Sequence, residues 1–319
     1  MVLVVTNRRD LTADWLILEL ERRGAGYVRF NTEDYPASTS LTWELDGPTT
    51  LSIGGAEHRL EPPLAIWYRR PLPPRLGDGL PGDAAEWAAG EAEAALTGVW
   101  RTRDAVWVNH PDANDRAGSK PEQLRTAARL GLDVPRSVVT DDPEAVRRLA
   151  AEVGGELVCK PLRSGHLSID GEEGLFFTSR LTSLDGELDA LGPEPYLFQE
   201  LVPKLYDVRV TVIGEETFAT RIESQSEQDA RIDWRRVDAG RLEHRVEALP
   251  PEIAERCVAL VRHYGLRFGA IDFAREPSGR YRFFELNPNG QWAWVEQFTG
   301  APMRSCLADL LLQGDAALA

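Results

Sequence analysis

The sequence predicts a mixed fold, with an α/β unit first and α+β units after it, because of three patterns in its 319 residues. Apolar strand segments alternate with helical segments at the start of the chain, which is typical of a small α/β domain with a parallel sheet. A helix and strands around a polar, glycine-rich loop follow, and the last third contains β-runs joined by short turns. We therefore expect domains at residues 1–112, 113–194 and 195–319.

The first domain begins with the apolar strand VLVV at 2–5. A helix is expected over about 12–23, because Gly24 is a suitable residue to end it. Two further strands are expected at 27–30 and 64–68, and a long Ala- and Glu-rich helix at 84–103. The domain is expected to end near the segment NHPDANDRAG.

The second domain is expected to start with a helix that runs from the N-cap Ser119 to Gly131. Strands at 156–161 and 175–179 flank the polar loop RSGHLSIDGEEG, and ALGPEP at 190–195 is a suitable hinge. The third domain contains YLFQELV, the paired runs DVRVTVIG and TFATRIES, a helix at 251–264 and a final pair of strands.

The final pair of strands, GAIDFAREPSGRYRFFELN, suggests a metal site. Pairing symmetric about the four-residue turn 277–280 sets Asp272 directly opposite Glu285. Alternation puts Glu285 and Asn287 on one face of the strand, and Phe284 and Leu286 on the other. Directly opposed like charges destabilise a strand pair, and a Mg²⁺ or Mn²⁺ ion with oxygen ligands removes that conflict.

Composition limits the classes of function. The formal net charge is −15, which argues against general binding of nucleic acids, so an anionic substrate needs a local arginine cluster. The apolar start VLVV is too short for a signal peptide, and no run approaches the ~18 apolar residues of a membrane span. Cys159, Cys257 and Cys306 are far apart and are expected to be reduced. The protein is therefore expected in the cytoplasm, without a membrane partner.

The two common nucleotide-binding loops are absent. GDGLPG at 77–82 fits the G-x-G-x-x-G pattern by letter but contains Pro81 and lies in a proline-rich loop. The segment around Lys120 lacks the leading glycine of a P-loop. Nucleotide chemistry would therefore need a different set of residues.

Several single residues suggest such a set, although each has an ordinary structural explanation. Lys160 ends the strand ELVCK ahead of Gly165, Gly171 and Gly174, where backbone N–H groups can cover a phosphate. Arginine within a strand, as at 209 and 221, needs an anionic partner. The segment IDWRR adds charged residues that an exposed loop would also explain.

Motifs follow one another along the chain in the order Lys120, the strand ending at Lys160, the glycine-rich loop, QELV, DVR, ATRIES, DWRR and IDF followed by FFELNPNG. This order of motifs closely resembles the ATP-grasp fold over about residues 113–319. Residues 1–110 are similar to the α/β domain that precedes it. Within that superfamily, IWYRRP at 66–71, NDRAGSKPEQLR, KLYDVRVTV and ELNPNGQWAW resemble the peptide maturases that make graspetides, the microviridin-type omega-ester or omega-amide peptides. These maturases are similar to RimK-type ligases.

The resemblance implies ATP and Mg²⁺ as cofactors and assigns roles to residues. It implies a nucleotide site formed by Lys120, Lys160, Gln199, Glu200, Leu201, Val202 and Asp207, with the lysines at the phosphates and the backbone of 200–202 at the adenine. It implies that Arg221 and Arg235 stabilise the acyl-phosphate and the incoming carboxylate, and that Asp272, Glu285 and Asn287 hold two Mg²⁺ ions. It also implies a ribosomal precursor peptide, with a leader and an acidic core, as the partner of a homodimer.

Three functions stay open from the sequence. The first is a macrocyclase that activates Asp or Glu side chains of the precursor peptide and joins them to Thr or Ser hydroxyls or to Lys amines. The second is a RimK-like ligase that adds amino acids or glutamate to a peptide or protein. The third is a peptide-binding module without catalysis, although such a module has no physical need for opposed carboxylates.

Overall fold

The computed structural model describes residues 1–77, 80–163, 166–169, 172–182, 186, 188, 192 and 194–313. Gly165 and Gly171 of the expected glycine-rich loop lie outside these residues, as do positions 190, 191 and 193 of the expected hinge. Among the described residues, no helix combines the length and apolar character that crossing a bilayer requires.

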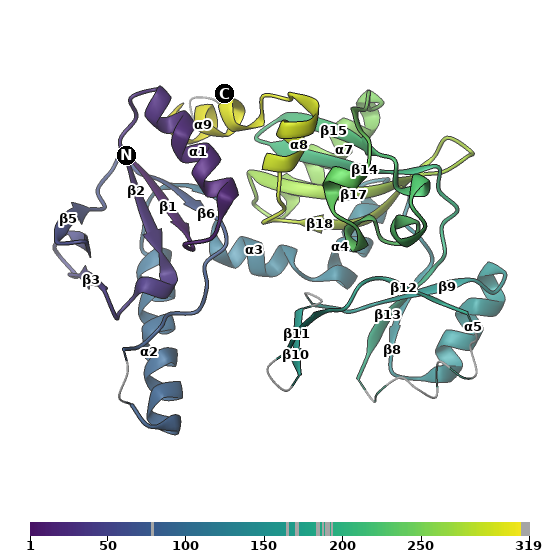
Figure 1. Cartoon of the computed structure of the whole chain (residues 1–319), viewed down its shortest axis with the longest axis horizontal. Coiled ribbons are helices and arrows are strands. Elements are labelled where there is room, and N and C mark those ends of the chain that lie inside the picture. The colour runs from purple at the N-terminus through teal and green to yellow at the C-terminus, as the bar shows by residue number, and fades with distance from the viewer. Residues whose placement is uncertain are drawn as a thin grey trace.

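The N-terminal region contains a parallel sheet of strand order β2-β1-β6-β7, as the alternating pattern predicts (Figure 1). Its strands and helices are β1 (Val2–Thr6), α1 (Leu11–Arg22), β2 (Tyr27–Asn31), β6 (Ala65–Tyr68), α2 (Gly82–Arg101) and β7 (Val106–Val108). Helix α1 begins at Asp10, whose carboxylate accepts from the N–H groups of Thr12 and Ala13. The sequence analysis did not predict the small antiparallel sheet of β3 (Thr39–Trp43), β4 (Thr49–Ile53) and β5 (Ala56–Arg59).

The central region consists of helices and a sheet of order β12-β9-β13-β8. It contains α3 (Pro111–Ala117), α4 (Lys120–Arg129), β8 (Ser137–Thr140), α5 (Pro143–Val153), β9 (Leu157–Lys160), the hairpin β10 (His166–Ile169) and β11 (Glu172–Leu175), β12 (Ser179–Leu181) and β13 (Tyr196–Glu200). Ser119 is the N-cap of α4, as expected, although its side chain makes no capping hydrogen bond. The single strand expected at 175–179 is wrong, because β11 ends at Leu175 and β12 begins at Ser179.

The C-terminal region is an antiparallel sheet of order β16-β15-β14-β17-β18. It contains β14 (Tyr206–Ile213), β15 (Glu216–Ile222), β16 (His244–Val246), α7 (Pro251–His263), β17 (Phe268–Arg275), β18 (Tyr281–Asn287), α8 (Ala293–Thr299) and α9 (Met303–Gln313). Four short 3₁₀ turns connect β15 to β16, among them η4 (Trp234–Arg236). Helix α7 packs on one face of the sheet through Cys257, Leu260 and Val261, which leaves the other face for the site.

The two ends of the chain share a core. Val295 of α8 and Leu307 of α9 are buried together with Val2 and Val4 of β1 and Leu16 of α1. Figure 1 shows α8 and α9 beside α1, at the junction between the N-terminal and C-terminal sheets. The N-terminal sheet is thus attached to the sheet that carries the site by apolar packing as well as by the chain itself.

Candidate active site

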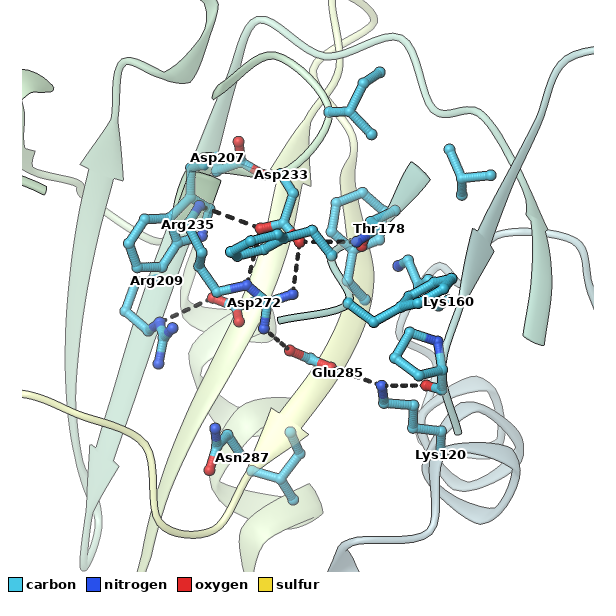
Figure 2. A pocket seen from close by; sticks show the side chains of 18 of the residues that line it. Lys120, Lys160, Thr178, Asp207, Arg209, Asp233, Arg235, Asp272, Glu285 and Asn287 are labelled. Carbon is cyan, nitrogen blue, oxygen red and sulfur yellow. Dashed lines mark hydrogen bonds and ion pairs between the residues drawn. The ribbon is translucent and has the colours of Figure 1, made fainter. Parts of the chain in front are cut away.

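A cavity of about 660 Å³ lies between the central sheet and the C-terminal sheet. This volume is within the range of about 300–1,000 Å³ that is typical of ligand pockets. Figure 2 shows that its charged side chains come from the start of α4, from the end of β9, from β14, β17 and β18, and from the segment around η4. Elements from two sheets therefore contribute to one polar site.

The two carboxylates meet as the sequence predicts. Asp272 on β17 is paired directly with Glu285 on β18, and Asn287 follows on the same strand opposite Ala270. Burial, with the negative charge of Glu285 adding to it, raises the pKa of Asp272. Burial would also raise the pKa of Glu285, but the positive charges of Arg235, Lys120 and Lys160 outweigh it and lower that pKa.

A β-bulge produces this pairing. Near the turn Arg275 pairs with Tyr281, so the two strands are symmetric about Ser278. The expected symmetry about a four-residue turn at 277–280 is therefore wrong. The register then shifts between Asp272 and Phe273, which restores the expected partner of Asp272.

The side chain of Phe284, the extra residue of the bulge, lies on a different face of the strand from the one expected. Phe284 lines the cavity together with Glu285, whereas strict alternation would place its ring on the opposite face. Leu286 is 2% exposed and belongs to the core beneath the sheet, as expected. Lys160 Nζ lies 4.4 Å from the centroid of the Phe284 ring.

Cations surround the carboxylate pair. Arg209 on β14 is directly opposite Asp272, with Nε 2.8 Å from Oδ1. Arg235 Nη1 donates to Glu285 Oε1 at 3.0 Å, and Lys120 Nζ lies 3.7 Å from Oε2. Repulsion within the pair is therefore offset by Arg209 from the neighbouring strand and by two residues from outside the hairpin.

Arg235 is held in place by Asp233. Its Nε and Nη2 donate to the two carboxylate oxygens of Asp233, each at 2.8 Å (Figure 2). Burial opposes the charge on Asp233, but these bonds hold its pKa well below the usual range. Asp233 also accepts from the N–H of Thr178 at 3.2 Å. The IDWRR segment is thus part of the site and not a solvated loop.

All three lysines of this chain line the cavity. Lys120 donates to the carbonyl of Pro161 at 2.7 Å, and burial lowers the pKa of Lys160 to about 8. Lys204, which the sequence analysis did not single out, donates to both carboxylate oxygens of Asp207 at 2.8 and 2.7 Å. Lysine appears nowhere else in the sequence, and this scarcity is a signal that could have identified Lys204.

Residues 200–202 also line the cavity, at the end of β13. The N–H groups of Glu200 and Leu201 donate to the carbonyls of Arg136 and Glu156, each at 2.9 Å. Within the part of the chain that is described, the Val202 N–H is therefore the one amide of the three that lacks a partner in the protein. The Gln199 side chain does not line the cavity; it is fully buried and donates to Ser137 at 2.9 Å, and its Oε1 has no partner in the described part of the chain.

The structure does not bring Arg221 into the cavity. Arg221 pairs with Val208, its guanidinium lies 3.8 Å from the centroid of the Tyr206 ring, and its Nε contacts Glu223 at 2.5 Å. Val208 and Tyr206 belong to the core beneath α7, on the face opposite Arg209. Arg221 therefore does not lie in the cavity, where it was expected. Arg209, which the same strand pattern had also indicated, lies there beside Asp272.

The oxygen donors of the site fit a magnesium ion. No group of three or more His, Cys, Asp and Glu side chains that could hold a metal occurs among the described residues. The candidate set is instead two carboxylates and an amide, from Asp272, Glu285 and Asn287. Mg²⁺ commonly takes one or two carboxylates and keeps several waters, so this hard-oxygen set suits it.

The protein-family model described as MvdD pre-ATP grasp domain matches residues 1–115. A Chryseobacterium gregarium RiPP-associated ATP-grasp ligase, solved in complex with ADP and a leader and core peptide, is similar to this chain with a TM-score of 0.89 and 29% identity, over 97% of this chain and 96% of that one. The macrocyclase MdnC from Microcystis aeruginosa MRC, solved with the precursor peptide MdnA, has a TM-score of 0.86 and 30% identity, over 98% and 99% of the two chains.

Curated relatives are more distant. A probable alpha-L-glutamate ligase of Sodalis glossinidius is 28% identical over 54% of this chain, and an Escherichia coli ribosomal protein bS6–L-glutamate ligase is 25% identical over 60%. The matched segments span 57% and 63% of the length of these two relatives.

Proposed function

We infer that this chain, which belongs to the RiPP-associated ATP-grasp ligases, activates Asp or Glu side chains of a ribosomally made precursor peptide with ATP. It then joins them to Thr or Ser hydroxyls as esters, or to Lys amines as amides, and so closes macrocycles. The observation that carries this proposal is the pair Asp272 and Glu285, which face each other in a cavity that all the lysines of the chain line.

Two bond exchanges make up the proposed reaction. A carboxylate oxygen of the peptide attacks the γ-phosphorus of ATP, the bond to the β-phosphate oxygen breaks, and ADP leaves. The hydroxyl or amine of the same peptide then attacks the carbonyl carbon of the acyl-phosphate. It loses its proton, and inorganic phosphate leaves with the electrons of the broken C–O bond. Activation is needed because a free carboxylate has only oxide as a leaving group.

The residues of the cavity suit this chemistry. Lys120 and Lys160 line the cavity and would neutralise phosphate charge, and Arg235, held by Asp233, would add a fixed guanidinium. The Val202 N–H is suited to the edge of an adenine ring, since the other two amides of that segment are already engaged. Asp207 also lines the cavity, where its carboxylate accepts from Lys204.

Asp272, Glu285 and Asn287 would hold Mg²⁺. The ion supplies charge neutralisation on the phosphates of ATP. In the ligand-free protein, Arg209, Arg235 and Lys120 offset the same negative charge. The carboxylates are thereby kept in place before nucleotide and metal bind.

The first prediction tests this proposal with the acidic precursor peptide encoded beside the gene. Incubated with the protein and Mg·ATP, the peptide is expected to lose the mass of one water for each cross-link, with ADP formed in equal amount. Asp272→Ala and Glu285→Ala should each lower the rate by at least about 100- to 1,000-fold, because each removes an electrostatic contact to the transferring phosphoryl group. Mass spectrometry of the peptide and an ADP assay measure both products.

Glu255→Ala is the matched control, since Glu255 is an exposed carboxylate on α7 and lies outside the cavity. It should leave the rate unchanged. Full activity in either cavity variant would overturn the metal assignment.

A glutamate ligase is the second candidate, because the curated relatives have that activity in their names. Such an enzyme adds the mass of glutamate to its acceptor, whereas cyclisation removes the mass of water. The same spectra therefore separate the two reactions. A binding module without catalysis would form no ADP with any of these peptides.

A homodimer and a cytoplasmic location remain predictions. Light scattering of the purified protein tests the first, and fractionation of the source cells tests the second.

A further inference from the structure

We propose that Arg69 is a positioning residue, through which the N-terminal domain holds residues 287–290, here called the site loop, in the shape that metal binding needs. This inference rests on the proposed function, because it concerns the Asn287 end of the same site. It gives a role in metal binding to the N-terminal domain, although the candidate metal ligands Asp272, Glu285 and Asn287 all lie in the C-terminal sheet.

Arg69 reaches the site loop from the end of β6. It is 1% exposed, and its Nη1 donates to the carbonyl of Asn289. Arg70 adds a second donor to the same carbonyl, with Nε at 3.3 Å, and lines the cavity. The RR of the IWYRRP segment is therefore directed at one backbone oxygen, two residues after Asn287.

Asn109, after β7, holds the same loop from another side. Its Nδ2 donates to the carbonyls of Pro288 and Phe268, each at 3.0 Å, and its Oδ1 accepts from the N–H of Phe268 at 3.0 Å. It therefore connects the site loop to the beginning of β17, the strand that carries Asp272. Both contacts come from the N-terminal sheet and end on backbone atoms next to the candidate metal ligands.

The site loop itself is tightly packed. Asn287 Oδ1 accepts from the Asn289 N–H at 3.0 Å, so a shift of Asn289 would move the amide group of Asn287. On the other side, a Cβ added to Gly290 would lie 2.2 Å from Ala270 Cβ and 3.1 Å from Arg209 Nη1. The loop is thus held between Arg69 and the strands that carry Asp272 and Arg209.

The burial of Arg69 is hard to explain by an ion pair alone. Its nearest carboxylate oxygen, Asp10 Oδ2, is 3.7 Å from Nε, and among the described residues its Nε and Nη2 have no hydrogen-bond partner. A buried guanidinium with so little compensation costs stability. Its one close hydrogen bond is to the site loop, so holding that loop is the role that the geometry offers.

A purely structural role is the alternative, and Arg23 provides the matched control. Arg23 also crosses from the N-terminal domain to the C-terminal part of the chain, where its Nη2 donates to the Ser305 carbonyl at 3.0 Å. It is 19% exposed and pairs with Glu19 and Asp309. Ser305 is in α9 and makes no part of the site loop at 287–290.

The experiment measures Mn²⁺ binding by electron paramagnetic resonance with saturating ADP, in the wild type, Arg69→Gln, Arg69→Lys and Arg23→Gln. Loss of an outer residue that orients metal ligands typically weakens metal binding by about 10–100-fold. We expect a loss of at least about 10-fold in Arg69→Gln and a smaller loss in Arg69→Lys, which keeps the charge and one donor. Arg23→Gln should bind Mn²⁺ like the wild type, although both glutamine variants lower the melting temperature.

Wild-type Mn²⁺ affinity in Arg69→Gln, or an equal loss in Arg23→Gln, would overturn the inference and leave the proposed function intact. If Arg69→Gln does not fold, unchanged affinity in Arg69→Lys overturns it. Failure of the wild type to bind Mn²⁺ with ADP would instead overturn the proposed metal site, and the inference with it.

Discussion

At the level of single residues, the positive charge of Lys160 costs free energy in the ligand-free site, because the pKa of its amine is lowered. Its side chain is buried beside Phe284, Lys120 and Arg235, and burial lowers its pKa to about 8, from an ordinary value of 10.5. The charged amine is therefore less favourable in the folded, ligand-free chain than in water. A phosphate group would add a further anion to the one that Glu285 already provides near this amine.

The second prediction follows from the sign of that shift. Between pH 8 and 10.5 the unfolded chain binds more protons at this position than the folded chain, so Lys160 makes stability rise with pH there. Below pH 8 both states are protonated and the cost is fully present. Lys160→Met should therefore stabilise the ligand-free protein at pH 7, and this gain should disappear above about pH 10.5.

Urea denaturation of both proteins at pH 7, 9 and 10.5 measures this difference. The variant should also bind ADP more weakly, which calorimetry measures. A variant less stable than the wild type at pH 7 would show that the Phe284 ring and Glu285 stabilise the amine more than burial destabilises it.

At the level of elements, the bulge in β18 decides which side chains face the cavity. Without it, the register beside the turn would pair Asp272 with Phe284, and Glu285 would lie opposite Ile271 on the core side. Gln123 of α4 fixes the strand just after the bulge, because its side chain donates to the carbonyl of Leu286 and accepts from its N–H, each at 2.8 Å. The helix that begins at Lys120 thus also holds the strand of Glu285.

The third prediction concerns the glycine of the site loop. Gly290→Ala should destabilise the protein by about 1–3 kcal/mol, since its Cβ would overlap Ala270 and displace Arg209. Gly98→Ala is the control: Gly98 lies in α2 with nothing within 4 Å of the added atom, and this variant should gain about 0.5–1 kcal/mol. Chemical denaturation measures both, and equal effects would contradict the packing argument.

At the level of the whole molecule, Arg282 connects the two sheets that enclose the cavity. Its guanidinium pairs with Glu276 at 2.8 Å within the C-terminal sheet and with Glu200 at the end of β13 in the central sheet. It also donates to the Val134 carbonyl at 3.3 Å. The segment proposed for adenine is therefore held to the strand of Glu285 by one buried ionic network.

The fourth prediction follows from the burial of this network. Arg282→Met should cost about 3–5 kcal/mol, because it leaves Glu276 and Glu200 without their buried partner, and it should weaken ADP binding. Arg280→Met is the matched control, since Arg280 pairs with the same Glu276 but its side chain is 58% exposed, against 8% for Arg282. The control should lose less than about 1 kcal/mol.

Equilibrium unfolding in urea and calorimetry with ADP check this prediction. Similar losses of stability in the two variants would show that burial does not set the strength of the network.

The sequence by itself determined the fold class and the centre of the site. Alternating apolar and polar residues and turn glycines are local signals, so the parallel N-terminal sheet and the final hairpin could be predicted, whereas the pair of Asp272 and Glu285 depends on a bulge that the sequence did not indicate. Only the tertiary structure decided that Arg209 reaches the cavity and Arg221 does not, because the face of a strand that is buried depends on which helix packs there. Only the tertiary structure brought Arg69 to Asn289, since no local pattern specifies a contact between residues 220 positions apart.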